Sequence, residues 1–90
     1  MQIEILYFAT LRDLAGARKE RLDLPEASTV GDLRARLSKR GDRLAQALNS
    51  ALFSVNREFA IPEELLTEGD ELGVFHPVSG GSHPTIFRVT

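Results

Sequence analysis

The chain has 90 residues, which is the size of one small domain with a single hydrophobic core. A domain of this size has little room for a deep catalytic pocket of its own. Its 42% hydrophobic and 27% charged residues are typical of a globular protein and argue against disorder along the whole chain. The absence of cysteine excludes a disulfide scaffold, a thiolate zinc site and a cysteine nucleophile.

The formal net charge of −2 does not suit a nucleic-acid-binding domain, where a basic surface is expected. Residues 1–45 hold nine basic and seven acidic side chains, whereas residues 46–90 hold two basic and six acidic ones. An acidic second half favours a basic partner or a basic active site of another protein. The N-terminal apolar run is too short for a signal peptide, and no stretch approaches the roughly 20 apolar residues of a membrane span. We therefore expect a cytoplasmic protein that binds neither nucleic acid nor membrane.

Residues 2–8 predict a strand, because their apolar side chains alternate with a period of two. Both faces of this strand carry apolar residues: Ile3, Ile5 and Tyr7 on one, Leu6 and Phe8 on the other. Such a strand lies at the centre of a sheet or turns its second face to a partner. Residues 18–24 alternate as well and predict an antiparallel hairpin. Residues 9–17 would connect its two strands, with one helical turn and Gly16 at a turn.

The main helix is predicted over residues 28–40, with Ser28 or Thr29 as the N-cap and Asp32 completing a capping box. Gly41 is expected to end it. The apolar stripe of this helix consists of Val30, Leu33 and Leu37. The remaining predicted elements are a short helix at 42–49 and strands at 52–56, 57–61 and 71–76. This order predicts an α+β fold, a mixed sheet with one main helix across it. It is compatible with a ubiquitin-like β-grasp roll, in which the first and last strands pair in parallel at the sheet centre.

No set of side chains in the sequence predicts catalysis or a metal site. His76 and His83 are seven residues apart and lack the further ligands that a metal ion needs. The serines lack a nucleophile-elbow motif. The basic run at 34–43 predicts the solvated face of a helix, and the acidic residues of the second half, Asp70 among them, predict a solvated surface.

The pair Gly80–Gly81 follows the last core strand and is the feature that points most directly to a function. Glycine has no side chain, so a Gly-Gly tail can enter a narrow channel of a partner enzyme. Residues 77–81 extend by about 3.4 Å each, roughly 17 Å in all, which is enough to carry a terminal carboxyl into a neighbour's buried site. The same pair is also common in flexible linkers.

Four stretches of the chain resemble the small, sulfur-carrier subunits of molybdopterin synthases. They are ILYFATLRDLAG (5–16), TVGDLRARL (29–37), VNREF (55–59) and LLTEGDELGVFHPVSGG (65–81). The resemblance covers residues 1–81 and implies the same ubiquitin-like fold. We therefore expect a carrier domain at 1–81. Residues 82–90 are then an extension, a linker or the start of a fused large-subunit domain.

The resemblance also implies a chemistry for the tail. The C-terminal glycine carboxylate of the family is adenylated by a ubiquitin-activating-like enzyme that uses ATP, and is then converted to a thiocarboxylate. The tail enters the large synthase subunit, where the sulfur passes to cyclic pyranopterin monophosphate. In this chain Gly81 would bear the sulfur, and the domain itself would bind no cofactor or metal.

The resemblance assigns further residues to the tail and to the surface that docks the large subunit. The rest of the tail would consist of Pro77, Val78, Ser79 and Gly80. The sheet face that docks the large subunit would carry Phe75, Phe8 and Leu6.

The residues after Gly81 depart from the family pattern, in which the chain ends at Gly-Gly. An internal Gly81 has no carboxylate to activate, so we expect carrier activity only after cleavage of the Gly81–Ser82 bond. The segment TIFRVT (85–90) resembles the opening strand of the large subunit and favours a small–large fusion, combined with such cleavage. Loss of carrier activity is a third explanation. Two other functions stay open: a ubiquitin-like modifier joined through Gly81 to lysines of targets, and a non-catalytic interaction domain.

Overall fold

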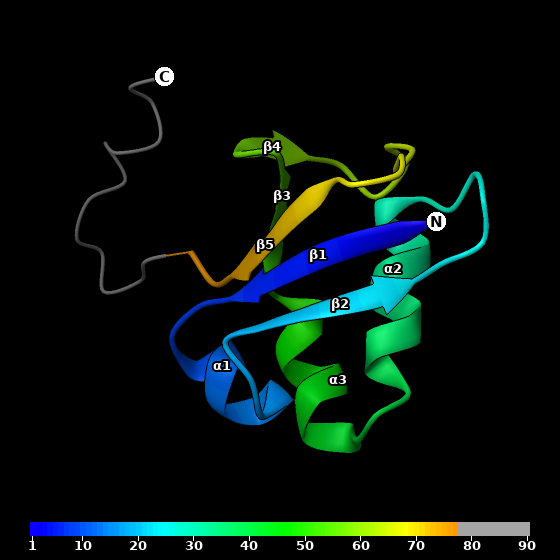
Figure 1. The fold of residues 1–90 in the computed structure, drawn as a ribbon. Helices are drawn as coiled ribbons and strands as arrows, with labels where there is room; N and C mark the ends of the chain where they lie inside the picture. The colour runs from blue at the N-terminus through cyan, green and yellow to red at the C-terminus, as the bar shows by residue number, and fades with distance from the viewer. Residues whose placement is uncertain (78–90) are drawn as a thin grey trace.

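The computed structural model describes residues 1–77. The predictions for the tail residues Val78, Ser79, Gly80 and Gly81, and for a strand at 85–90, lie outside the described residues. Within residues 1–77 one mixed sheet is covered on one face by helices (Figure 1). The elements are, in chain order, β1 (Gln2–Tyr7), α1 (Thr10–Ala15), β2 (Lys19–Asp23), α2 (Val30–Ser38), α3 (Asp42–Asn49), β3 (Leu52–Val55), β4 (Glu58–Ala60) and β5 (Glu71–Phe75).

The five strands of the sheet lie in the order β2-β1-β5-β3-β4. β1 and β5, the first and last strands, pair in parallel, and every other pair is antiparallel. The predicted α+β class and the parallel pairing at the sheet centre are therefore confirmed. Each strand is shorter than predicted by one residue at one or both ends.

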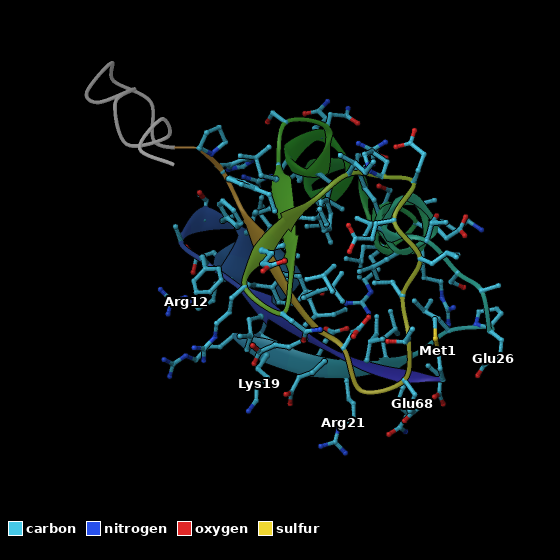
Figure 2. All side chains as sticks on the ribbon, turned by 90° about the horizontal axis from the view of Figure 1, so that it is seen from above. Met1, Arg12, Lys19, Arg21, Glu26 and Glu68 are labelled. Carbon is cyan, nitrogen blue, oxygen red and sulfur yellow. The ribbon has the colours of Figure 1, made fainter. Side chains whose placement is uncertain are left out.

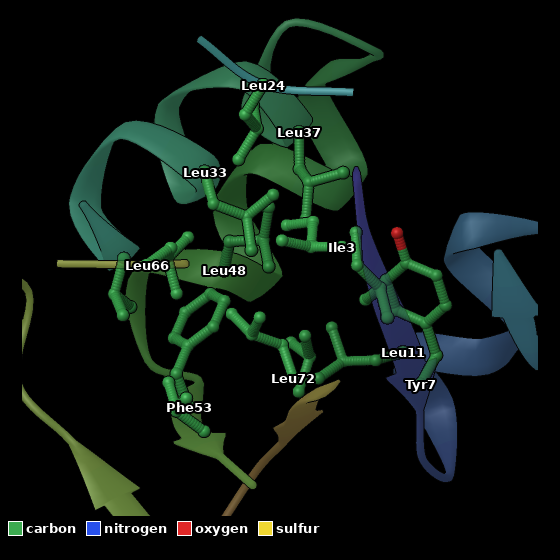
Figure 3. Packing of buried hydrophobic residues seen from close by; sticks show 14 of the residues in the cluster. Ile3, Tyr7, Leu11, Leu24, Leu33, Leu37, Leu48, Phe53, Leu66 and Leu72 are labelled. Carbon is green, nitrogen blue, oxygen red and sulfur yellow. The ribbon is translucent and has the colours of Figure 1, made fainter. Parts of the chain in front are cut away.

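The core lies between the inner face of the sheet and the helices (Figure 3). The predicted inward face of β1 is confirmed, since Ile3, Ile5 and Tyr7 are at most 3% exposed. The predicted stripe of α2 is also confirmed, and it packs with the same cluster: Val30, Leu33 and Leu37. Truncating a fully buried leucine of this kind to alanine costs about 2–5 kcal/mol of folding free energy. The alternating pattern of the sequence thus produces one continuous core.

Two short-range signals set where helices begin and end. At the start of α2 the Thr29 hydroxyl accepts a hydrogen bond from the Asp32 amide at 3.1 Å, and the Asp32 carboxylate accepts one from the Thr29 amide at 2.9 Å. The predicted capping box is therefore confirmed. The predicted turn at residues 9–17 is a longer element, the helix α1. Gly16 ends α1 with a φ of 80°, a left-handed conformation that glycine adopts without strain.

The prediction that Gly41 ends the main helix is wrong. α2 ends at Ser38, and the next two amides, those of Lys39 and Arg40, bond to carbonyls only three residues back, at 3.3 and 3.1 Å. These bonds tighten the last turn and satisfy carbonyls that the helix would otherwise leave free. Gly41 lies at the N-cap of α3 in extended backbone and separates the two helices.

Candidate functional site

The outer face of the sheet, opposite the helices, carries an exposed aromatic cluster formed by Phe8, Phe59 and Phe75. The rings of Phe8 and Phe75 meet edge to face with centroids 6.4 Å apart, and those of Phe59 and Phe75 lie 6.0 Å apart. Phe8 is 49% exposed and Phe59 63% exposed, so the cluster presents apolar surface to solvent. Apolar side chains gathered in this way are typical of an interaction surface.

Phe59 was not singled out by the sequence, because residues 57–61 predicted only a brief edge strand. The structure pairs Ser54 of β3 with Phe59 of β4. Phe53 and Val55 of β3 point into the core, so Ser54 and its partner Phe59 face outwards. The sequence did contain a signal for this placement. Buried and outward-facing side chains alternate along β3, and the β3–β4 hairpin then places Phe59 on the same face as Ser54.

A hollow beside the aromatic cluster exists because residue 73 is glycine. Gly73 of β5 lies between Leu6 of β1 and Ser54 of β3. A Cβ atom at this position would come 2.7 Å from the Ser54 hydroxyl and 3.4 Å from the Phe8 ring. Without it the outer face is hollowed by about 210 Å³, with Leu6, Phe8 and Gly73 in its lining. The close approach of neighbouring side chains therefore requires glycine here.

The root of the tail lies at the edge of the aromatic cluster. β5 ends at Phe75, and His76 and Pro77 follow beside the end of β1 (Figure 1). The Phe8 amide donates a hydrogen bond to the Val74 carbonyl at 3.1 Å, which keeps Phe8 next to the end of β5. The His76 ring Nε2 lies 2.8 Å from the Ala47 carbonyl at the end of α3. A chain leaving at Pro77 thus starts from an anchored point next to an apolar surface.

A hydrogen-bond network at the opposite end of β5 holds the strand in register. The Asp70 carboxylate accepts hydrogen bonds from the Thr67 amide at 2.8 Å, the Thr67 hydroxyl at 3.1 Å and the Asn56 side-chain amide at 3.0 Å. The Asn56 side-chain oxygen in turn accepts from the Glu71 amide at 3.0 Å. The prediction of a solvated acidic surface is therefore wrong for Asp70, which is 9% exposed. By fixing the start of β5, this network also fixes where Gly73 and Phe75 lie.

Tyr7, on the inner face of the sheet, is a buried ionisable side chain with a shifted pKa. Burial raises the pKa of the Tyr7 phenol to about 12, and the Glu20 carboxylate acts in the same direction while Arg40 opposes it. The Arg40 guanidinium meets the Glu20 carboxylate through two hydrogen bonds of 3.0 and 2.5 Å, but the Tyr7 hydroxyl makes no hydrogen bond with the described residues. The phenol therefore stays neutral at physiological pH and acts as a core side chain.

Residues 1–77 hold no group of three or more His, Asp or Glu side chains placed to bind a metal ion. No helix among them is both long and apolar enough to cross a membrane. His83 lies outside the described residues. What the geometry provides is an apolar surface with a tail rooted at its edge.

The structure brings together every described residue that the sequence assigned to the site. Leu6, Phe8 and Phe75 share the outer face of the sheet, and Pro77 is exposed at the root of the tail. The docking role of this face stays a prediction, and so do the roles of the residues beyond Pro77.

Comparison with known proteins gives one family and consistent relatives. The model of the ThiS family matches residues 5–81. The chain is similar to the molybdopterin synthase sulfur carrier subunit of Escherichia coli (strain K12), with 39% identity over 83 residues, covering 88% of this chain and 99% of the relative.

Solved structures agree on the architecture. The small archaeal modifier protein 1 of Haloferax volcanii is 30% identical with a TM-score of 0.77, covering 86% of this chain and 98% of that one. A protein from the complex of subunits 1 and 2 of the molybdopterin-converting factor of Helicobacter pylori is 21% identical with a TM-score of 0.65, covering 90% and 100%. A ubiquitin from Caldiarchaeum subterraneum, 17% identical, has a TM-score of 0.60 and covers 90% and 98%. The predicted ubiquitin-like β-grasp fold is therefore confirmed.

Proposed function

Because the chain belongs to the ThiS family, we propose that it is a sulfur carrier in molybdopterin biosynthesis. The observation that carries the proposal is the position of the tail root: the chain leaves β5 directly beside the aromatic cluster on the outer face. A carrier needs these two features together, because its partner must hold the domain while the tail reaches a buried site. The name of the Escherichia coli relative, a sulfur carrier subunit, supports the same role.

In this proposal the sulfur travels on Gly81, after hydrolysis of the Gly81–Ser82 peptide bond has exposed the Gly81 carboxylate. An activating enzyme of the ubiquitin-activating type transfers AMP from ATP to the Gly81 carboxylate, releasing pyrophosphate. A sulfide-level sulfur nucleophile, supplied by a separate donor, then attacks the Gly81 carbonyl carbon. The bond to AMP breaks, AMP leaves, and a thiocarboxylate remains. The large synthase subunit accepts the tail, and the sulfur passes to cyclic pyranopterin monophosphate. The chain supplies no side chain for these steps, which fits the absence of cysteine in its sequence.

The large subunit docks on the outer face of the sheet in this proposal. Leu6, Phe8 and Phe75 form the apolar centre of the contact, and Phe59 extends it towards β4. The Helicobacter pylori structure is of a complex between two subunits of the molybdopterin-converting factor, which supports a two-subunit assembly. Exposed aromatic side chains at the centre of a contact carry a large share of its binding free energy.

Intact-mass analysis of the chain expressed with its activating enzyme tests the proposal. We expect a species that ends at Gly81, and a second one heavier by the difference between sulfur and oxygen. A chain encoded to end at Gly81 needs no protease, so it distinguishes a missing cleavage from a failure of the activation itself. This chain keeps every element that the structure describes, since the last of them, β5, ends at Phe75. If the encoded chain never gains sulfur, the carrier function is wrong.

A matched variant tests the role of the tail. In the chain that ends at residue 81, Gly81→Ala adds one methyl group where the tail enters its partner. We expect normal folding, because residue 81 lies outside all the described helices and strands, but impaired sulfur transfer. Unchanged synthase activity would contradict tail threading.

A second candidate is a protein modifier, favoured by the likeness to the small archaeal modifier protein 1 of Haloferax volcanii. It would use the same processed tail, joined through Gly81 to lysines of target proteins. Mass spectrometry of captured targets distinguishes the two functions. Isopeptide bonds between Gly81 and lysine would support the modifier, and their absence beside a thiocarboxylate would support the carrier alone.

A further inference from the structure

Charged side chains border the outer face of the sheet at both of its ends. Three cations, Arg12, Arg18 and Lys19, border the end where β1 finishes and the tail begins, and we name them the basic rim. Figure 2 shows Arg12 and Lys19 on one side of the molecule, away from Glu26 and Glu68, which lie near Met1. The edge of the sheet at which the tail begins thus carries a group of three cations, although the net charge of the chain is −2.

The charges of the basic rim are largely uncompensated. Among residues 1–77, Arg12 and Arg18 take part in no salt bridge. Lys19 lies 3.6 Å from the Glu4 carboxylate, with its side chain 58% exposed, so this pair is weak. Arg40 differs, because Glu20 neutralises it through two hydrogen bonds.

The basic rim is continuous with the aromatic cluster and with the tail root. A hollow of about 410 Å³ is lined by the three cations together with Leu6, Tyr7 and Phe8. Leu6 and Phe8 also line the hollow above Gly73, so one apolar ridge connects the two. Cations beside an exposed apolar centre reproduce the arrangement of protein interfaces, in which a polar rim surrounds an apolar core.

We propose that the basic rim docks on carboxylates that border the tail-receiving channel of the large subunit. The proposal rests on the proposed function and adds a chemistry for the partner. The large subunit would present an apolar pocket that receives Phe8, with carboxylate side chains beside it. Charges in this position steer the approach, because attraction at the tail end turns the molecule so that the tail arrives first.

Steering affects the association rate more than the dissociation rate. The interaction between exposed charges also weakens as salt shortens the Debye length, from about 30 Å at 0.01 M to about 3 Å at 1 M ionic strength. An association rate that falls with added salt in the parent, but not in a variant without the basic rim, is therefore the specific signature.

Stopped-flow or surface measurements of binding to the isolated large subunit test the proposal, using the full chain and the chain that ends at Gly81. The test variant is Arg12→Glu with Arg18→Glu. The control is Lys39→Glu with Arg43→Glu, an equal change of charge at two exposed residues on the helical side. We expect association at low salt to slow by about tenfold in the test variant and by less than about twofold in the control. Arg12→Gln with Arg18→Gln, which introduces no new charge, should give a smaller slowing in the same direction.

The outcomes separate the inference from the function. If the parent binds and the test and control variants associate at equal rates, the docking role of the basic rim is wrong, and the carrier function is unaffected. An absence of parent binding overturns the docking proposed for the carrier, and the basic rim with it. Slowing that is confined to the basic-rim variants and disappears near 1 M salt supports the inference.

Discussion

The ionisation of Tyr7 gives a direct measure of how well the inner face of the sheet is closed. Tyr7 is the only tyrosine in the chain, which has no tryptophan, so the near-ultraviolet absorbance of tyrosinate reports this residue alone. The side chain is 3% exposed, and its hydroxyl has no hydrogen-bond partner among the described residues. Burial first, and the Glu20 carboxylate second, raise its pKa from the ordinary 10.0 to about 12.

This pKa shift makes folding stability depend on pH in a defined range. The folded state favours the neutral phenol, so the stabilisation is fully present below about pH 10 and is lost as the pH rises towards about 12. A shift of two units corresponds to about 2.7 kcal/mol in total. About 1.3 kcal/mol of this is lost between about pH 9 and about pH 11.

Two measurements check the prediction. Absorbance titration should give a midpoint of about 12 for the folded chain and about 10 in denaturant. The free energy of unfolding should fall by about 1.3 kcal/mol more in the parent than in Tyr7→Phe between about pH 9 and about pH 11, because only the parent has a phenol that ionises. At neutral pH the variant should be at least as stable as the parent, since it removes an unpaired buried hydroxyl. A folded midpoint near 10, or identical pH dependence of the two proteins, would refute the reasoning.

Two further predictions concern the outer face. Gly73→Ala should destabilise the fold by about 1 kcal/mol or more in denaturant unfolding, since its Cβ would lie 2.7 Å from the Ser54 hydroxyl. Ser54→Ala should recover most of that loss, and an equal loss in both backgrounds would contradict the steric explanation. Phe8→Ala should weaken binding to the large subunit by about 2 kcal/mol, roughly thirtyfold in Kd by titration calorimetry. The matched control is Leu65→Ala, which removes a 60% exposed apolar side chain from outside the aromatic cluster and should change Kd little.

Local patterns in the sequence were sufficient to predict most of the elements. The alternation in β1 predicted both its buried face and its central place, because residues two apart necessarily share a face of a strand. Thr29 and Asp32 predicted the start of α2, because a capping box involves only residues within one helical turn. The resemblance to the sulfur-carrier subunits, and not a local pattern, identified Leu6, Phe8 and Phe75 as candidates for the docking surface.

The ends of elements and the contacts between distant segments needed the tertiary structure. Asp70 looked like one of several solvated carboxylates, yet it binds Asn56, a residue 14 positions away in the chain. Phe59 joined the aromatic cluster only through the register of β4 against β3. No periodicity encodes such pairings, since they depend on how the hairpin and β5 come together.

The sequence by itself therefore determined the α+β class, the buried faces of β1 and α2, and a Gly-Gly pair after the last core strand. Only the tertiary structure decided that the Phe59 ring joins those of Phe8 and Phe75 on the outer face. The physical reason is the register of β4 against β3, which pairs Phe59 with Ser54 and which no pattern within either strand encodes.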